Sequence, residues 1–271
     1  MTAAIESAPR ASNANPNVPM LRSMPMETKS NSLSLEAMLR CSTWAPTLTP
    51  AELDRVVAET RERSVPAGGY AIRCGEPADH WIGIIEGLVK MSVSQADGRQ
   101  STLTGVTAGA WAGEGSLLQP GRWRFDGVAL RPTRIACMPR ATFERLLHGN
   151  LAFNHFLLRH INARLSMFIG LVEYDRMYGP DARVAHCLAG LFDTALNPGT
   201  GTFVQLSQEE IGLLAAVSRQ RANEALHALE RAGLLRVEYG GVTVLDLAGL
   251  RRYAGAAQGG ERVARRDRLA A

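Results

Sequence analysis

The stretch from Leu206 to Val237 constrains the fold of this chain more than any other, because it predicts two short helices joined by a tight turn. Ser207 and Glu210 have the spacing of a capping box at the start of the first helix. Ser218 is an N-cap candidate for the second helix, and Gly233 stands where that helix would end. Apolar residues recur at helical spacing between these signals. Small residues stand where the two helices would cross: Gly212, Ala215, Ala216 and Ala222.

The first exposed turn of the second helix is polar, which is typical of a helix-turn-helix that reads double-stranded DNA. In the major groove, Arg can bind guanine, Asn or Gln can bind adenine, and Glu can accept from cytosine. Two short strands, Leu234–Glu238 and Val242–Leu245, follow as a wing. A helical hairpin with a solvated polar face is the alternative, and the caps, turn and wing together favour DNA binding. The residues expected at the DNA are Ser207, Gln208, Ser218, Arg219, Gln220, Arg221, Asn223 and Glu224.

The charge of the chain agrees with a polyanionic partner but does not by itself indicate one. The 271 residues carry a formal net charge of +4, with a sequence pI of about 9.1. Residues 179–253, which hold the helix-turn-helix, contain seven arginines and eight acidic residues. DNA binding is therefore predicted from the motif and not from bulk charge.

The four cysteines are far apart and lack the spacing of a zinc or iron–sulfur site, so we expect reduced thiols in a cytoplasmic protein and no metal. No apolar run reaches roughly 18 residues, so no membrane span is expected. The N-terminus lacks the pattern of a secretory signal.

The remaining sequence predicts an α+β chain in a fixed order of segments. Residues 1–40 are expected to be a disordered tail in which Ser34–Leu39 begins a short helix. Short strands at intervals of about 8–12 residues follow, and they indicate an all-β barrel or roll within residues 41–148. The winged helix-turn-helix domain is assigned to residues 179–253 and a flexible tail to residues 254–271.

A long helix from Leu151 to about Tyr174, within residues 149–178, is expected to join the roll to the DNA-binding domain. Its apolar residues are spaced alternately by three and four, or by seven, which is the pattern of a coiled-coil seam. A helix packed only on its own domain is the alternative, but a helix-turn-helix also requires a two-fold partner. The expected homodimer interface is Leu151, Leu158, Ile161, Leu165, Phe168 and Val172. Gly179-Pro180 is the expected hinge.

With these segments in this order, the chain resembles the Crp/Fnr family of bacterial transcription regulators from roughly Trp44 to Tyr253. The helix-turn-helix carries the resemblance most strongly. Four further segments support it: Val65-Pro66-Ala67-Gly68, Gly75-Glu76-Pro77-Ala78-Asp79, Glu86-Gly87-Leu88-Val89-Lys90 and Gly113-Glu114-Gly115-Ser116-Leu117-Leu118. The resemblance implies a jelly-roll sensor domain, a homodimer on two-fold DNA and contact with RNA polymerase. The family's first DNA-reading Arg maps onto Arg219, whereas Gln220 and Glu224 depart from its pattern.

The resemblance also implies where an effector would bind. In cyclic-nucleotide-binding members, the Glu of a Gly-Glu pair binds the ribose hydroxyl, and a later Arg with two small residues binds the phosphate. Counting forward from Gly113-Glu114 places that Arg on Arg124, but Phe125 and Asp126 follow it and would crowd and repel a phosphate. A cyclic mononucleotide, a cyclic dinucleotide and no small ligand all stay open. The candidate effector residues are Gly113, Glu114, Gly115, Ser116, Arg122 and Arg124.

Two other functions compete with a signal-responsive regulator. An enzyme with a regulatory nucleotide domain is disfavoured, because the sequence has no Gly-rich phosphate loop after a strand and no Ser/His/Asp or metal cluster. A constitutive DNA-binding dimer, whose roll only dimerises or contacts a partner protein, is favoured by Phe125-Asp126. The sequence therefore predicts a DNA-binding protein that is not an enzyme and leaves its signal open.

Overall fold

The structure is a computed structural model that describes residues 33–94, 100–119, 121–177 and 179–253. The predicted tails at residues 1–32 and 254–271 lie outside the described residues. Three short helices begin the described chain: α1 (Leu35–Cys41), the 3-10 turn η1 (Ala45–Thr47) and α2 (Pro50–Glu59). A disordered tail reaching residue 40 is wrong for its last part, because α1 is folded and buries Met38 and Leu39. Burial removes these two apolar side chains from water, and this stabilises the folded helix α1.

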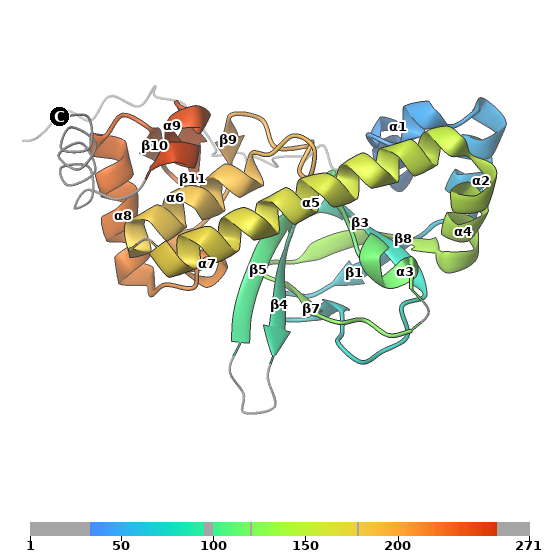
Figure 1. The fold of residues 1–271 in the computed structure, drawn as a ribbon, viewed down its shortest axis with the longest axis horizontal. Coiled ribbons are helices and arrows are strands. Elements are labelled where there is room, and N and C mark those ends of the chain that lie inside the picture. The colour runs from blue at the N-terminus through green and yellow to red at the C-terminus, as the bar shows by residue number, and fades with distance from the viewer. Residues whose placement is uncertain (1–32, 95–99, 120, 178, 254–271) are drawn as a thin grey trace, which may run out of the picture. The chain divides into compact units, whose positions relative to one another are not determined.

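Two antiparallel four-stranded sheets form the predicted β-roll (Figure 1). One sheet has the order β1-β8-β3-β6 and the other β2-β7-β4-β5. The short helix α3 (Glu114–Leu117) lies between β6 and β7 in the chain. The strands are β1 (Arg61–Val65), β2 (Tyr70–Ile72), β3 (His80–Glu86), β4 (Leu88–Ser94), β5 (Gln100–Thr107), β6 (Trp111–Ala112), β7 (Asp126–Ala129) and β8 (Thr133–Pro139).

An aromatic cluster joins the roll to the helices that precede and follow it. The indoles of Trp44, Trp81 and Trp111 lie within 4.5–6.1 Å of one another between ring centroids. Phe143 of α4 (Arg140–Gly149) and Phe153 of α5 (Leu151–Met177) pack edge-on against Trp81. These large buried rings fix the first turns of α5 against the roll, because such aromatic contacts contribute beyond their buried area.

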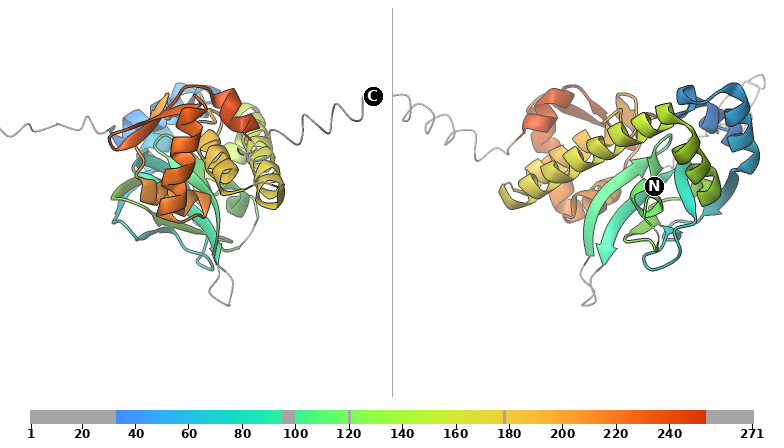
Figure 2. Two further views of the ribbon diagram at one scale, coloured as in Figure 1. Left: turned by 90° about the vertical axis from the view of Figure 1, so that its left-hand side faces the viewer. Right: turned by 45° about the vertical axis from the view of Figure 1, so that its right-hand side comes forward.

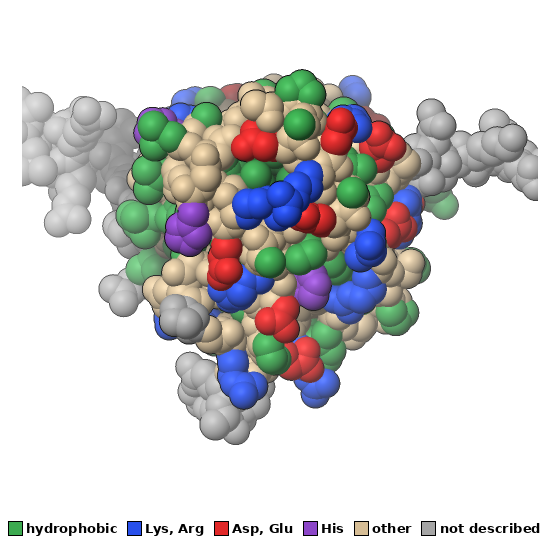
Figure 3. Space-filling model, turned by 90° about the vertical axis from the view of Figure 1, so that its right-hand side faces the viewer, with side chains coloured by type: hydrophobic (Ala, Val, Ile, Leu, Met, Phe, Trp, Pro, Cys, Tyr) green, Lys and Arg blue, Asp and Glu red, His purple; other side chains and the backbone are tan. Residues whose placement is uncertain are grey.

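The face formed by α1, α2 and α4 carries basic and acidic side chains interspersed (Figure 3). Arg40 bonds to Glu36 at 2.9 Å and to Asp54 at 2.8 Å, and Arg55 bonds to Glu59 at 2.8 Å. Because the two signs compensate locally, this face is not the one on which a polyanion would be sought.

Helix α5 leads from the roll to the second domain (Figure 2). The side chains of the predicted seam fall into two groups by their exposure. Leu151, Leu158, Leu165 and Val172 are 71%, 66%, 55% and 53% exposed. Ile161 and Phe168, in contrast, are half-buried within the chain, and Phe168 lines a cavity of about 760 Å³ together with residues of β5 and the next helix. The exposed apolar stripe on α5 therefore contains only four of the six residues that were expected at the dimer interface.

The second domain is the predicted winged helix-turn-helix. A small three-stranded sheet with the order β10-β11-β9 packs with four helices around one apolar core. Two roll residues, Leu88 and Leu130, join that core. The elements are α6 (Pro180–Leu191), β9 (Phe203–Val204), α7 (Gln208–Ala215), α8 (Arg219–Arg231), β10 (Leu235–Glu238), β11 (Gly241–Val244) and α9 (Leu247–Arg252).

Candidate DNA-binding face and effector site

Both helices of the helix-turn-helix begin at the predicted caps. The Glu210 backbone N–H donates to Ser207 Oγ at 3.2 Å, and the Ser207 N–H donates to Glu210 Oε2 at 2.8 Å, which completes the capping box of α7. The Arg221 N–H donates to Ser218 Oγ at 3.2 Å and caps α8. These bonds hold the two helix starts, where free amides and the helix dipole favour an anion such as a DNA phosphate.

The turn between α7 and α8 is tight. It requires glycine at one position and a left-handed backbone conformation at another. A Cβ on Gly212 would lie 2.9 Å from the Val217 carbonyl oxygen, so only glycine lets the chain pass there. Ala216 ends α7 with φ at 52°, and it is the one non-glycine residue with positive φ among those that the structure describes. An L-residue pays a steric cost in this region, because Cβ crowds the following carbonyl.

Replacing Ala216 with glycine is therefore expected to raise the free energy of unfolding by about 0.5–1 kcal/mol, because glycine removes this strain at an unchanged φ. Urea denaturation monitored by circular dichroism would measure the change. Gly240, at the wing turn, already has φ at 76°. Gly240→Ala is the reverse substitution, and it is expected to lower the free energy of unfolding. If Ala216→Gly also lowered the free energy of unfolding, Ala216 would not be strained.

The start of α8 presents a polar face, and its side chains differ in the hydrogen bonds that they make within the chain. Arg221 donates to Glu224 at 2.6 Å, and this bond lowers the pKa of the Glu224 carboxyl, so the pair stays ionised. Gln208 donates to Asn223 at 2.6 Å, which ties α7 to α8. Among the described residues, none pairs with the exposed guanidinium of Arg219. Arg219 is thus the side chain of this face that is most available for a base.

Side chains of the roll hold the first helix of the motif. Arg131 Nε donates to Glu210 Oε1 at 2.8 Å, and its Nη2 donates to the Gln205 carbonyl at 2.8 Å. Thr102 of β5 donates to the Leu213 carbonyl at 3.0 Å. Because Glu210 also belongs to the capping box of α7, a movement of the roll at Arg131 would act directly on the start of that helix.

Glu114, the candidate ribose-binding carboxylate, points to α5 in this structure. Its Oε1 accepts from Arg164 Nε at 2.7 Å, and Arg164 Nη2 donates to the Trp111 carbonyl at 2.9 Å. Burial alone would raise the pKa of Glu114, but the charge of Arg164 overcomes it and holds the pKa below its ordinary value. His160 stacks on Phe156, and burial lowers its pKa, so its Nε2 accepts from Arg164 at 3.2 Å. Glu114 is an ionised member of a buried cluster.

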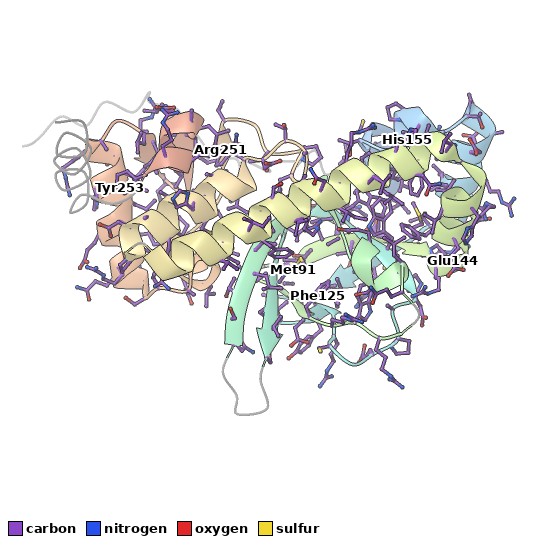
Figure 4. All side chains as sticks on the ribbon, viewed as in Figure 1. Met91, Phe125, Glu144, His155, Arg251 and Tyr253 are labelled. Atoms are coloured by element: carbon purple, nitrogen blue, oxygen red, sulfur yellow. The ribbon has the colours of Figure 1, made fainter. Side chains whose placement is uncertain are left out.

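The two candidate phosphate-binding arginines lie on the surface. Arg122 donates to the Gly75 carbonyl at 2.7 Å, and Arg124 donates to Gln119 Oε1 at 2.8 Å. Between them, the Trp123 side chain turns into the roll and is only 7% exposed. Met91 of β4 belongs to the same buried core as Trp123, and the partly buried Phe125 packs against that core (Figure 4).

Sequence reasoning missed Trp123, Arg164 and His160. Trp123 stands between two arginines. In an extended segment successive side chains point to opposite sides, so this alternation could have indicated that Trp123 points inward. Arg164 and His160 are one helical turn apart, but no spacing rule links them to Glu114, which is about 50 residues earlier in the chain.

Two family models match the chain. The cyclic nucleotide-binding domain matches residues 62–150, and the Crp-like helix-turn-helix domain matches residues 182–253. The transcriptional regulator LdrP of Thermus thermophilus is 33% identical over 186 residues, which cover 68% of this chain and 91% of LdrP. The chain belongs to the Crp/Fnr family of transcription regulators. This confirms the resemblance, the fold class and the assignment as a DNA-binding transcription regulator.

Two further proteins are similar to the chain at lower identity. The cyclic AMP receptor protein of Thermus thermophilus is 27% identical over 210 residues, which cover 76% of this chain and 94% of that protein. The solved structure of FixK2 from Bradyrhizobium japonicum has a TM-score of 0.60 at 18% identity and covers 73% of this chain and 98% of FixK2. That likeness shows the shared fold.

No described helix is long and apolar enough to cross a membrane. Within the same residues, no group of three or more His, Cys, Asp or Glu side chains is arranged to hold a metal ion.

Proposed function

We propose that this Crp/Fnr regulator acts as a homodimer that reads a two-fold symmetric site in double-stranded DNA. The observation that carries the proposal is the exposed apolar stripe on α5. Leu151, Leu158, Leu165 and Val172 recur every seven residues, and more than half of each side chain is exposed. A second copy of α5 packed along this stripe would remove these side chains from water, as in a coiled coil.

The exposed positions also support a register for the two helices. With the four stripe residues as d positions, the a positions are His155, Asn162 and Ile169, all of which are exposed. A polar Asn at an a position specifies register and a two-stranded state at a cost in stability. Ile161 and Phe168 leave the proposed interface, because they are half-buried within their own chain. The proposed interface is Leu151, His155, Leu158, Asn162, Leu165, Ile169 and Val172.

In such a dimer, the two α8 helices would enter successive major grooves about 34 Å apart. We assign base reading to Arg219, with Gln220, Arg221, Asn223 and Glu224 shaping the contact. The capped starts of α7 and α8, at Ser207-Gln208 and Ser218, would hold phosphates through their amides. RNA polymerase is the proposed protein partner, and the cytoplasm is the proposed place of action, because both DNA and polymerase are there in bacteria.

Arg219→Ala is expected to weaken binding to the cognate site by about 1–3 kcal/mol and to relax preference at one base position per half-site. The site would first be selected from random DNA with the wild-type protein, and affinities would then be measured on that site and on scrambled DNA. Arg231→Ala, at the far end of the same helix, is the control and should change little. Equal losses on cognate and scrambled DNA would remove Arg219 from base reading.

Two candidate signals remain for the roll. The match to the cyclic nucleotide-binding domain and the named cyclic AMP receptor relative favour a cyclic mononucleotide at Gly113, Glu114, Gly115 and Ser116. A cyclic dinucleotide is the other nucleotide candidate, and Arg122 and Arg124 would be its surface contacts. The buried Trp123 favours the second candidate function, a regulator that binds DNA with no small ligand.

A further inference from the structure

A cavity of about 760 Å³ lies where the roll, α5 and the helix-turn-helix domain meet. Strand β5 lines it from the roll, and α6 and the end of α7 line it from the DNA-binding domain. Sites for small molecules have volumes of about 300–1,000 Å³ and often lie between domains. The candidate effector residues near α3, all of which the structure describes, do not line this cavity, so it is separate from the effector site considered for the roll.

Small residues on two neighbouring helices leave this space open. Ala163, Ser166 and Gly170 line the cavity from α5, and Ala189 and Gly190 line it from α6. A Cβ built on Gly190 would meet no atom within 4 Å, so the space begins directly at the α6 backbone. Protein interiors contain few voids larger than a water molecule. A space of this size between helices of one chain therefore indicates a place for a ligand.

Larger apolar side chains form the walls, and the chain leaves them incompletely buried. Leu103 of β5 is half-buried at the cavity, as are Met167 and Phe168 of α5. Leu171 of α5 also lines it and is 37% exposed. An apolar group placed among these side chains would remove their surface from water, and this favours binding. The walls therefore fit a ligand whose larger part is apolar.

The described ionisable side chains at the cavity carry a net charge of +1, because two are cations and one is an anion. Arg183 and Arg251 are the cations, and Asp193, which lies 3.6 Å from Arg251, is the one carboxylate among the described lining residues. Burial lowers the pKa of His186 to about 4, so its imidazole is neutral near pH 7. Arg183 Nη2 donates to the Ala216 carbonyl at 3.4 Å, which places the guanidinium beside the end of α7. A negative group on a ligand would be attracted to this lining.

The cavity also reaches the segment that sets the direction of the DNA-reading helix. Leu214, Ala215 and Ala216 line it at the end of α7, directly before the turn into α8. A ligand shifts a protein toward the state that it binds best. A ligand in contact with these three residues would therefore stabilise the arrangement of α5, α6 and α7 in this structure over any other arrangement.

We propose that this cavity binds a small amphiphilic carboxylate, with its apolar group between α5 and α6 and its carboxylate facing Arg183. A medium-chain fatty acid and an aromatic acid both have this chemistry, since each joins one anionic group to an apolar body. Binding of the ligand does not depend on the proposed function. The effect of the ligand on DNA affinity rests on it, because that effect requires a DNA-binding dimer.

The first test measures binding to the full-length wild-type protein without DNA. The probe is 1-anilinonaphthalene-8-sulfonate, which joins apolar rings to one anionic group and reports binding to apolar surfaces by its fluorescence. We expect one saturable site per protomer. Decanoate should displace the probe about tenfold more effectively than decanol, which has the same chain without the charge. No saturable site, or a site from which decanoate does not displace the probe, would overturn the proposal.

The second test fills the cavity from one wall. Gly190→Leu is expected to abolish the binding of probe and decanoate. Its melting temperature should equal or exceed that of the wild type, because leucine favours a helix more than glycine does. Gly149→Leu is the matched control and should bind as the wild type does. A Cβ on Gly149, at the end of α4, also meets no atom within 4 Å, but Gly149 does not line the cavity.

Two results with Gly190→Leu would contradict the proposal. A folded Gly190→Leu protein that still binds the probe would place the probe elsewhere. Conversion of the dimer to a monomer by Gly190→Leu, measured by sedimentation velocity, would show that a partner chain and not a small ligand fills the cavity.

The third test concerns the charge at the cavity. Arg183→Gln should bind decanoate and decanol about equally well, because the cation that favours the carboxylate is gone. An unchanged preference for decanoate would overturn the role of Arg183.

The last test measures the effect of the ligand on DNA binding. Saturating decanoate should change the affinity of the wild type for its selected DNA site by about fivefold or more, and that of Gly190→Leu not at all. An unchanged wild-type affinity would overturn the regulatory effect. Failure to select any DNA would refute the proposed function and leave the binding result standing.

Discussion

Replacing Leu158 and Leu165 together with glutamate is expected to convert the dimer to a monomer and to weaken binding to the two-fold DNA site at least a hundredfold. The single chain tolerates the change, because these side chains are 66% and 55% exposed before any partner binds. In the dimer, the same change would bury carboxylates of like charge against each other. A monomer engages only one half-site, and the gain from linking two sites is about 10²–10⁴ in affinity.

Sedimentation velocity would measure the oligomeric state, and titration of the selected DNA would measure affinity. Leu171→Glu is the matched control, because Leu171 lies on the same helix but lines the cavity between α5 and β5. It should remain dimeric. If the double variant sediments as the wild type does, the stripe on α5 is not the dimer interface.

Removing one partner of the buried Glu114–Arg164 pair is the second change with a large expected effect. Arg164→Met leaves the Glu114 carboxylate without its cation in a site where Glu114 is 2% exposed. Breaking a buried pair from one side costs about 3–5 kcal/mol, whereas replacing both partners with apolar groups costs far less. We therefore expect Arg164→Met to lower the free energy of unfolding by that amount, and Glu114→Leu with Arg164→Met to recover most of it.

Urea denaturation at one fixed protomer concentration would measure these changes, because dimerisation couples stability to concentration. Arg40→Met removes an exposed pair with Glu36 and should leave the unfolding free energy nearly unchanged. If Glu114→Leu with Arg164→Met were no more stable than Arg164→Met alone, the loss of stability would come from altered packing and not from an unpaired buried charge.

Local signals were sufficient to predict the helix-turn-helix. The capping box at Ser207-Glu210 closes within three residues, and the structure contains it. A roll of short strands within residues 41–148 is also predicted from local signals, because turn residues and short apolar runs mark such strands along the chain. The exceptions are short elements: α3, β6 and α9 have few residues and too little periodicity to be distinguished from loops.

What the sequence determined by itself is the order of roll, long helix and winged helix-turn-helix, since capping and periodicity depend on neighbours three or four residues apart. Only the tertiary structure decided which side chain after α3 points inward, and it is Trp123 and not Arg124. It also decided that Glu114 meets Arg164, and which stripe of α5 stays exposed. The physical reason is the same in each case, because these outcomes depend on contacts between segments far apart in the chain. Local spacing does not distinguish the possible directions of a side chain, whereas close packing and the cost of burying charge do.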